Sequence, residues 1–388
     1  MKKLQKALAL LGTVVLMASC DGIIGYAIHM QKTDTHQYRY NDNEDVEDDT
    51  IRFVVNKHTM QMLMKAEVNG MEDTVLYDSG ASPCAMVFYT KDTKPDGMKF
   101  YKVPLMGADK RTKVRMTYIP VTIKTPMFVS ELFGNAMLME PSQVCDKEGA
   151  TNRYTIIGFS GIGIGCFQLD FSQNKVYKMS RTEIDSTEYV PVKSKFDNGV
   201  LFVYPTINGV EYECIFDTGN GNGILIQDAQ RVENHIDSDM LFEGAYGKAI
   251  GGVTEKQSFV VAPQTTVCFA ERKESVPVMF LERNLAFNNV GMQYIKRFDW
   301  IIDTYKDKVY AKPHIADTMQ TTKRRYGITS DAGILQIKTR LIDGKEVFKV
   351  GDQIVSVNGE KINEENICYY YDLLTENKDW SGLDVQVK

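Results

Sequence analysis

The sequence has few histidines, and none of them belongs to a metal-binding pattern. Its 5 His are scattered, HExxH does not occur, and its 7 Cys include no CxxC pair. Zinc sites and dithiol redox centres usually carry ligands or thiols at such short spacings. The sequence therefore suggests neither a metal site nor a redox motif.

The chain also lacks a surplus of charge of one sign and any long apolar run. From residue 51 onward it has 40 basic and 43 acidic side chains, which gives no reason to expect a nucleic-acid partner. The most apolar stretch, Ala7–Ala18, is too short to span a bilayer as a permanent helix. With 388 residues, 43% hydrophobic and 25% charged, the composition is that of a globular protein with room for two or three domains.

The N-terminus has the pattern of an export signal. Three lysines among the first six residues precede the apolar stretch, which ends in two small residues followed by Cys20. This junction resembles the lipobox of bacterial lipoproteins. The resemblance implies that residues 1–20 are a signal peptide, that Cys20 is lipidated, and that the protein is anchored to a membrane of the cell envelope. The alternative is an ordinary secretory signal in which the cysteine stands by chance.

Residues 21–50 are predicted to form a tether. They contain eight acidic side chains against Lys32 and Arg39, and they show no hydrophobic period. Such a segment cannot bury enough apolar area to fold. An exported location would permit disulfides among the six other cysteines, but their wide spacing leaves the pairing open.

Two copies of one unit organise the middle of the chain. Asn69-Gly70 is followed by Asp78, and Asn208-Gly209 is followed by Asp217, with nine residues from Asn to Asp in both copies. Near the end of each copy the spacing matches again, with 12 residues from Gly158 to Asp170 and 12 from Gly291 to Asp303. We interpret residues 51–181 and 198–313 as two repeats joined by a polar connector, 182–197.

Both repeats are expected to consist of strands. Each Asn-Gly pair is typical of a hairpin turn, and turn signals recur about every ten residues. Short strands are expected at 118–123, 258–261, 266–269 and 308–310, with one helix near 227–234. The predicted fold class is mainly β: two pseudo-symmetric β lobes followed by a small α/β domain.

An Asp-Ser/Thr-Gly triplet stands at the same position in each repeat. Both triplets follow an apolar strand, which would carry the aspartate into the protein, where an unpartnered carboxylate is costly. A pseudo-twofold arrangement would bring Asp78 and Asp217 together, and two adjacent carboxyls share one proton. Such a pair can activate a water and protonate a leaving amine. The alternative is that each triplet only forms a local turn.

The segment Asp78-Ser79-Gly80-Ala81-Ser82 resembles the active-site signature of clan AA aspartic proteases, the retropepsin and pepsin-like family. The apolar-apolar-Gly segment 156–158 and its counterpart 290–291 resemble the strand that threads the catalytic loop in this family. The resemblance implies water-mediated peptide hydrolysis without cofactor or metal, by a monomer that carries both halves of the site. It makes Asp78 and Asp217 the catalytic pair, supported by Ser79, Gly80, Thr218 and Gly219.

The resemblance to the protease family is less complete in the flaps and in the residues that follow the second triplet. Residues 250–253 resemble a flap tip, with Gly251 and Gly252 as candidates, and Gly107 is the candidate in the first repeat. Asn220 follows the second triplet where the family usually has a small or hydroxyl residue. The outer oxygen of Asp217 would therefore either lose a hydrogen-bond donor or gain one from Asn220.

The C-terminal residues 322–388 resemble a PDZ domain. The run 351–359, GDQIVSVNG, matches the core pattern of that family, with an earlier strand expected at 334–341, a helix at 364–374 and a last strand at 383–387. Tyr326, Gly327 and Ile328 stand where the family has its carboxylate-binding loop. The resemblance implies capture of a peptide C-terminus. The alternative is a domain that packs on the protease and binds nothing.

Together these features predict an aspartic endopeptidase of the bacterial cell envelope that acts on peptide or protein substrates. The alternative function is a non-catalytic peptide-binding lipoprotein that retains both folds. Substrate, pH optimum, membrane and leaflet are left open by the sequence.

Overall fold

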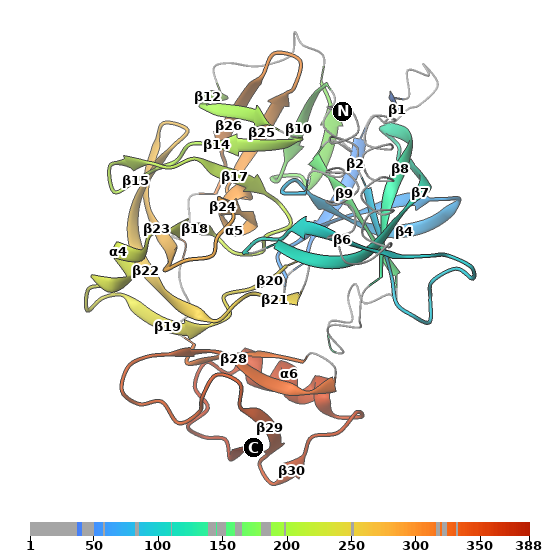
Figure 1. Cartoon of the computed structure of the whole chain (residues 1–388). Helices are drawn as coiled ribbons and strands as arrows, with labels where there is room; N and C mark the ends of the chain where they lie inside the picture. The colour runs from blue at the N-terminus through green and yellow to red at the C-terminus, as the bar shows by residue number, and fades with distance from the viewer. Residues whose placement is uncertain are drawn as a thin grey trace, which may run out of the picture.

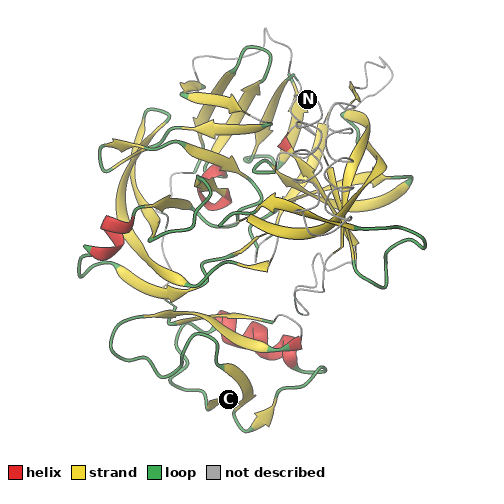
Figure 2. Cartoon of the chain, viewed as in Figure 1, coloured by secondary structure: helices red, strands yellow, loops and turns green. Residues whose placement is uncertain are grey.

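Strands dominate the computed structural model (Figure 2), which confirms the mainly β prediction. The structure describes residues 37–40, 50–56, 59–81, 85–109, 111–138, 145, 153–159, 165–179, 188–197, 199–249, 252–315, 319, 324–330 and 333–388. These residues form a 14-stranded sheet, a 15-stranded sheet and a two-stranded hairpin. Over these ranges, no helix combines the length and apolarity needed to cross a membrane.

The first half of the molecule, coloured blue to green in Figure 1, consists mainly of strands over its described residues. Its strands are β1 (Gln37–Tyr40), β2 (Thr50–Val55), β3 (Met62–Val68), β4 (Met71–Asp78), β5 (Ala85–Tyr89), β6 (Tyr101–Met106), β7 (Arg111–Lys124), β8 (Phe128–Leu138), β9 (Arg153–Gly158), β10 (Cys166–Asp170) and β11 (Lys175–Lys178).

The second half adds two short helices to a similar set of strands. Its elements are β12 (Val190–Val192), β13 (Ser194–Asp197), β14 (Val200–Val203), β15 (Thr206–Ile207), β16 (Val210–Glu211), β17 (Cys214–Asp217), β18 (Ile224–Gln227), α4 (Ala229–Glu233), β19 (Met240–Gly244), β20 (Lys248–Ala249), β21 (Gly252–Val253), β22 (Gln257–Phe269), β23 (Arg272–Leu281), β24 (Asn288–Gly291), α5 (Met292–Ile295), β25 (Phe298–Asp303) and β26 (Lys308–Pro313).

The two halves repeat one strand arrangement around the Asp-Ser/Thr-Gly triplets. In the first half β4 runs parallel to β9, with Asp78 opposite Gly158. In the second half β17 runs parallel to β24, with Asp217 opposite Gly291. The next strand, β5 or β18, is antiparallel to β9 or β24 and parallel to β8 or β23. The spacing found in the sequence thus corresponds to a repeat in three dimensions.

The Asn-Gly turns fix the hairpins that lead to both triplets. Asn69 and Gly70 have φ of 51° and 78°, and Asn208 and Gly209 have 49° and 86°. Positive φ at both central residues gives the tight turn that matches the twist of paired strands. Each Asn side chain also accepts a hydrogen bond from a neighbouring strand. Asn69 accepts from the Thr122 N–H at 2.8 Å, and Asn208 accepts from the Thr266 N–H at 3.2 Å.

The halves are joined by a sheet at the top of Figure 1. Strand β10 of the first half pairs antiparallel with β25 of the second, and the order β12-β26-β25-β10-β11-β2 is continuous. A single apolar core that includes the fully buried Trp300 extends through both halves. Asp170 and Asp303, which are equivalent in the two repeats, close the turns after β10 and β25 by accepting hydrogen bonds from backbone N–H groups.

The last part of the chain forms a unit with its own core. It contains β27 (Tyr326–Thr329), β28 (Leu335–Leu341), β29 (Gln353–Val357), β30 (Glu360–Lys361), α6 (Ile367–Glu376) and β31 (Val385–Val387). Tyr326, Leu335 and Trp380 are buried in its separate apolar cluster. This C-terminal unit is not loosely linked, because β28 pairs with β19 and extends the sheet of the second half (Figure 1).

Some local predictions were wrong, whereas both helix predictions were confirmed to within a few residues. Strand β1 lies within the predicted tether and pairs with β8, because Gln37–Tyr40 carries two tyrosines and no acidic residue. The predicted connector contains β12 and β13. The segments 258–261 and 266–269 belong to one strand, β22, whose pairing with β23 shifts register between Ala262 and Thr265. The helices predicted near 227–234 and 364–374 form at 229–233 and 367–376.

Candidate active site

The two triplets are fastened to each other by four hydrogen bonds that cross between the halves. The Ser79 hydroxyl donates to the Phe216 carbonyl at 2.7 Å, and the Thr218 hydroxyl donates to the Tyr77 carbonyl at 2.7 Å. In return, the Ser79 N–H donates to Thr218 Oγ1 at 3.0 Å, and the Thr218 N–H donates to Ser79 Oγ at 2.9 Å. Ser79 and Thr218 are fully buried, so water does not compete for these bonds.

This clamp brings Asp78 and Asp217 into contact. The two carboxyls are hydrogen-bonded to each other, and both residues keep part of their surface exposed. Each also accepts backbone N–H bonds from its own loop: Asp78 from Gly80 at 3.0 Å, and Asp217 from Gly219 at 2.9 Å and Asn220 at 3.0 Å. The structure therefore brings together the six residues singled out as catalytic pair and support.

The glycines of the triplets lie directly against the opposite carboxyl. A Cβ on Gly219 would be 2.3 Å from Cγ of Asp78, and a Cβ on Gly80 would be 2.5 Å from Cγ of Asp217. No heavier residue could occupy either position without pushing the carboxyls apart. This close approach is the physical reason for glycine at the third position of both triplets.

The two carboxyls differ in how tightly they hold a proton. Burial raises the pKa of Asp78 well above its ordinary value, and the charge of Asp217 and the hydrogen bond to it raise the pKa further. Burial also raises the pKa of Asp217, but hydrogen bonds from Asn289, Asp78, Asn220 and Gly219 oppose that rise. Backbone N–H groups lower the pKa of both residues, but only Asp217 also has the side-chain donor Asn289, which favours Asp217 as the ionised member of the pair and Asp78 as the protonated one.

A chain of asparagines supports the carboxylate of Asp217; the sequence pointed to Asn220 but not to Asn289 or Asn222. Asn289 Nδ2 donates to Asp217 Oδ2 at 2.6 Å, and Asn220 Nδ2 donates to Asn289 Oδ1 at 2.7 Å. Asn222 in turn donates through its backbone N–H and its amide to Asn220 Oδ1. The outer oxygen of Asp217 thus gains its donor from Asn289, while the Asn220 side chain orients that donor. The equivalent residue in the first half is Ile156.

The flap candidates lie on hairpins from opposite halves. Gly107 follows β6 at the tip of the β6–β7 hairpin, and Gly252 begins β21 in the small β20–β21 hairpin; Gly251 is outside the described residues. The first tip contacts the second half, because the Glu255 N–H donates to Asp109 Oδ2 at 2.7 Å and the Ala286 N–H donates to the Ala108 carbonyl at 2.8 Å.

The predicted peptide-end residues form a strand and not a loop. Tyr326, Gly327 and Ile328 belong to β27, where Tyr326 and Ile328 are buried. Cys145 of the first half is buried in the same cluster as these two side chains.

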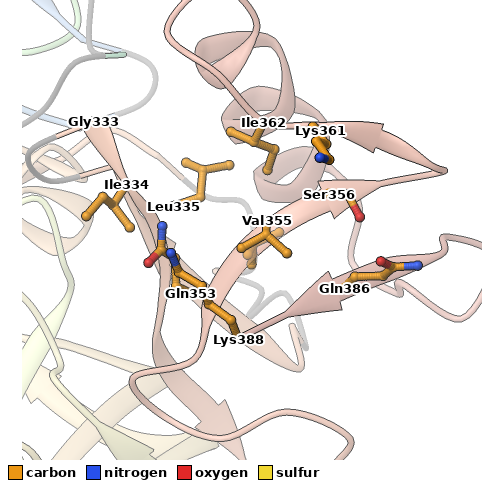
Figure 3. Close-up of a pocket in the computed structure, with 11 residues that line it drawn as sticks. Gly333, Ile334, Leu335, Gln353, Val355, Ser356, Lys361, Ile362, Gln386 and Lys388 are labelled. Carbon is orange, nitrogen blue, oxygen red and sulfur yellow. The ribbon is translucent and has the colours of Figure 1, made fainter.

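The C-terminal unit has a pocket of about 380 Å³, which lies away from the predicted peptide-end residues (Figure 3). Its lining includes Leu335, Gln353, Ser356 and Lys361, and none of the three predicted peptide-end residues.

Cys20 and the other residues before 37 lie outside the described part of the chain. Among the residues that the structure describes, no group of three or more His, Cys, Asp or Glu side chains could hold a metal ion. No protein-family model matches the chain, and no curated protein matches it either. The function of the site therefore has to be argued from its geometry.

Proposed function

We propose that the protein is an aspartic endopeptidase in which Asp78 and Asp217 activate a water molecule between them. The observation that carries the proposal is the hydrogen-bonded carboxyl pair, held by two equivalent loops that are clamped through Ser79 and Thr218. The two halves are interpreted as retropepsin-like lobes and the C-terminal unit as a PDZ-like domain. The repeated strand order around the triplets supports the first interpretation.

The difference between the two carboxyls assigns their roles. Ionised Asp217, supported by three N–H donors, accepts a proton from the attacking water. Protonated Asp78 donates its hydrogen bond to the substrate carbonyl and stabilises the oxygen of the tetrahedral intermediate. A proton then passes to the amine as the peptide bond breaks, which returns the pair to its singly protonated state.

The proposal also assigns substrate binding to the C-terminal unit and membrane attachment to the N-terminus. In the PDZ-like interpretation the C-terminal unit presents peptide or protein to the catalytic half. Cys20 carries the lipid that holds the enzyme at a membrane of the bacterial cell envelope.

Substitution of either aspartate by asparagine tests the proposal. Asp78→Asn and Asp217→Asn should each reduce cleavage of a broad peptide library by a factor of at least about 1,000, and the double variant should be scarcely worse than either single one. Wild-type activity should be bell-shaped in pH, because only the singly protonated pair is competent. Mass spectrometry of the library products between acid and neutral pH measures these rates.

Loss of fold would not explain the expected loss of activity. The pKa of Asp78 is higher in the folded protein than its ordinary value of 3.8, so the folded state binds this proton more tightly than the unfolded state. Ionisation of the pair therefore costs stability as the pH rises above that value, and Asp78→Asn removes this cost. The variant should melt at least as high as the wild type at neutral pH. Cleavage that survives Asp217→Asn would overturn the dyad, and absence of wild-type cleavage would favour the peptide-binding alternative.

A further inference from the structure

Two cysteines from distant parts of the chain meet in the core of the C-terminal unit. Cys145 belongs to the connection between β8 and β9 of the first half, yet it is 8% exposed and clusters with Tyr326, Ile328 and Ile367. Cys368 is the second residue of α6, is partly buried and packs against the same cluster.

The contacts of the Cys145 thiol place it between β27 and α6. Cys145 shares its apolar cluster with Ile328 of β27 and Ile367 of α6, and its thiol is hydrogen-bonded to the Cys368 thiol. Asp372, one turn further along α6, is close enough to act on the thiol electrostatically. Apolar side chains from both neighbouring elements pack around Cys145 and hold it next to Cys368.

We propose that Cys145 and Cys368 form a disulfide that fastens the first half of the molecule to the C-terminal unit. This proposal does not depend on the proteolytic function, because it concerns two thiols away from the carboxyl pair. Among the described cysteines, Cys166 and Cys214 are buried in strands of the main body, and Cys268 is exposed on β22.

The bond forms by exchange with an external disulfide, RSSR. The Cys368 thiolate attacks one sulfur of RSSR, forms a mixed disulfide and releases RS⁻. Cys145 then loses its proton and attacks the Cys368 sulfur, releasing the second RS⁻. Both released thiolates take up the protons that the cysteines lost. Two cysteine thiols are oxidised and RSSR is reduced to two RSH.

The order of attack follows from accessibility. Burial and the hydrogen bond that the Cys145 thiol donates to Cys368 raise the pKa of Cys145 to about 12, which leaves little thiolate to attack an external oxidant. Cys368 is partly exposed and meets the oxidant first. Once Cys368 carries the mixed disulfide, the adjacent Cys145 has its target within contact distance.

The bond would close a ring of connections among the first half, the second half and the C-terminal unit. Strand β28 already attaches the C-terminal unit to β19 of the second half, and β10 attaches the second half to the first through β25. A disulfide from Cys145 to Cys368 closes a very long loop, which restricts the unfolded chain and should raise the melting temperature.

Peptide mapping of the full-length protein tests the proposal. After incubation with oxidised glutathione, free thiols are blocked by alkylation and the protein is digested with trypsin without reductant. We expect a linked species made of the peptides 125–147 and 362–378, each of which contains one cysteine, and its loss after treatment with dithiothreitol. The oxidised protein should also melt several degrees above the reduced protein.

Cysteine variants provide the matched controls. Cys145→Ser and Cys368→Ser should each abolish the linked species, whereas Cys268→Ser should retain it. If either cysteine is recovered alkylated, as a glutathione adduct, or joined to another cysteine in the oxidised wild type, the proposed pairing is wrong. Because this readout uses the wild type, it remains decisive if a variant fails to fold.

Discussion

Asp78 and Asp217 occupy equivalent positions, but one residue on the neighbouring strand makes their surroundings unequal. Asn289 faces Asp217 with an amide donor, whereas the corresponding position beside Asp78 is the apolar Ile156. An amide that donates to a carboxylate stabilises its ionised form and lowers its pKa. The asymmetry of the pair is therefore built into β24, and in the proposed mechanism it would determine which carboxyl receives the proton of the water.

Replacing Asn289 by alanine should move the acid limb of the activity profile to higher pH. Without this donor the ionised form of Asp217 is less stable, so its pKa rises and the pair becomes competent only at higher pH. A hydrogen bond to a charged group contributes about 1.5–3 kcal/mol, which corresponds to a shift of about 1–2 pH units. The dependence of kcat/KM on pH measures the shift.

Asn288→Ala is the matched control for this prediction. Asn288 is the preceding residue on β24, and its side chain contacts the backbone of Gln227 and Glu213 and not the carboxyl pair. Its profile should coincide with that of the wild type. Coincident profiles for Asn289→Ala and Asn288→Ala would show that the amide does not set the ionisation of Asp217.

At the scale of elements, the junction between β19 and β28 depends on a glycine. Gly244 has φ of +126°, and a Cβ there would lie 2.1 Å from the Lys338 carbonyl oxygen. Only glycine adopts this backbone conformation without strain and also allows such a close approach. The junction is reinforced by Arg340, whose Nε donates to Glu243 Oε1 at 2.6 Å.

Gly244→Ala should therefore loosen the C-terminal unit from the second half. The combined strain and clash should cost about 2 kcal/mol, which would accelerate exchange of the Ile342 amide about 30-fold. This amide donates to the Leu241 carbonyl at 2.8 Å, next to the junction, so hydrogen exchange with mass spectrometry reports on it.

Gly247→Ala serves as the comparison. A Cβ on Gly247 would have no heavy atom within 4 Å, and the φ of this residue is not positive, so the added methyl group meets neither a clash nor strain. Equal exchange at Ile342 in both variants would mean that Gly244 does not hold the junction.

At the scale of the whole molecule, three connections arrange the parts around the carboxyl pair. The β10–β25 pairing joins the halves, the β19–β28 pairing adds the C-terminal unit, and the β6–β7 hairpin of the first half contacts the second half through Asp109. The first described residues, in β1, pair with β8 of the first half. A lipid on Cys20 would therefore hold the whole arrangement at the membrane through the first half.

Cys20→Ala should release the protein from the membrane. The alanine variant has no thiol to accept lipid, so the protein should move from the membrane pellet to the soluble envelope fraction, with most of it redistributed. Fractionation of cells followed by immunoblotting measures the change. Ser19→Ala, which keeps a small residue before the cysteine, should remain in the pellet. Retention of Cys20→Ala at the membrane would rule out this anchor.

The sequence by itself determined the repeat, the hairpin turns and the mainly β class. These features depend on local chemistry: Asn-Gly favours a turn with positive φ, alternating apolar residues favour strands, and equal spacings place Asp78 and Asp217 at equivalent strand ends. The sequence also indicated that these aspartates would meet, because a buried carboxyl requires a partner.

Only the tertiary structure decided how those parts contact one another. Asn289 is an ordinary strand residue in the sequence, and its donation to Asp217 depends on the parallel pairing of β17 with β24. The pairing of β28 with β19 and the burial of Cys145 beside Cys368 likewise join segments far apart in the chain. Such contacts depend on which surfaces meet after folding, and no local pattern of residues encodes that choice.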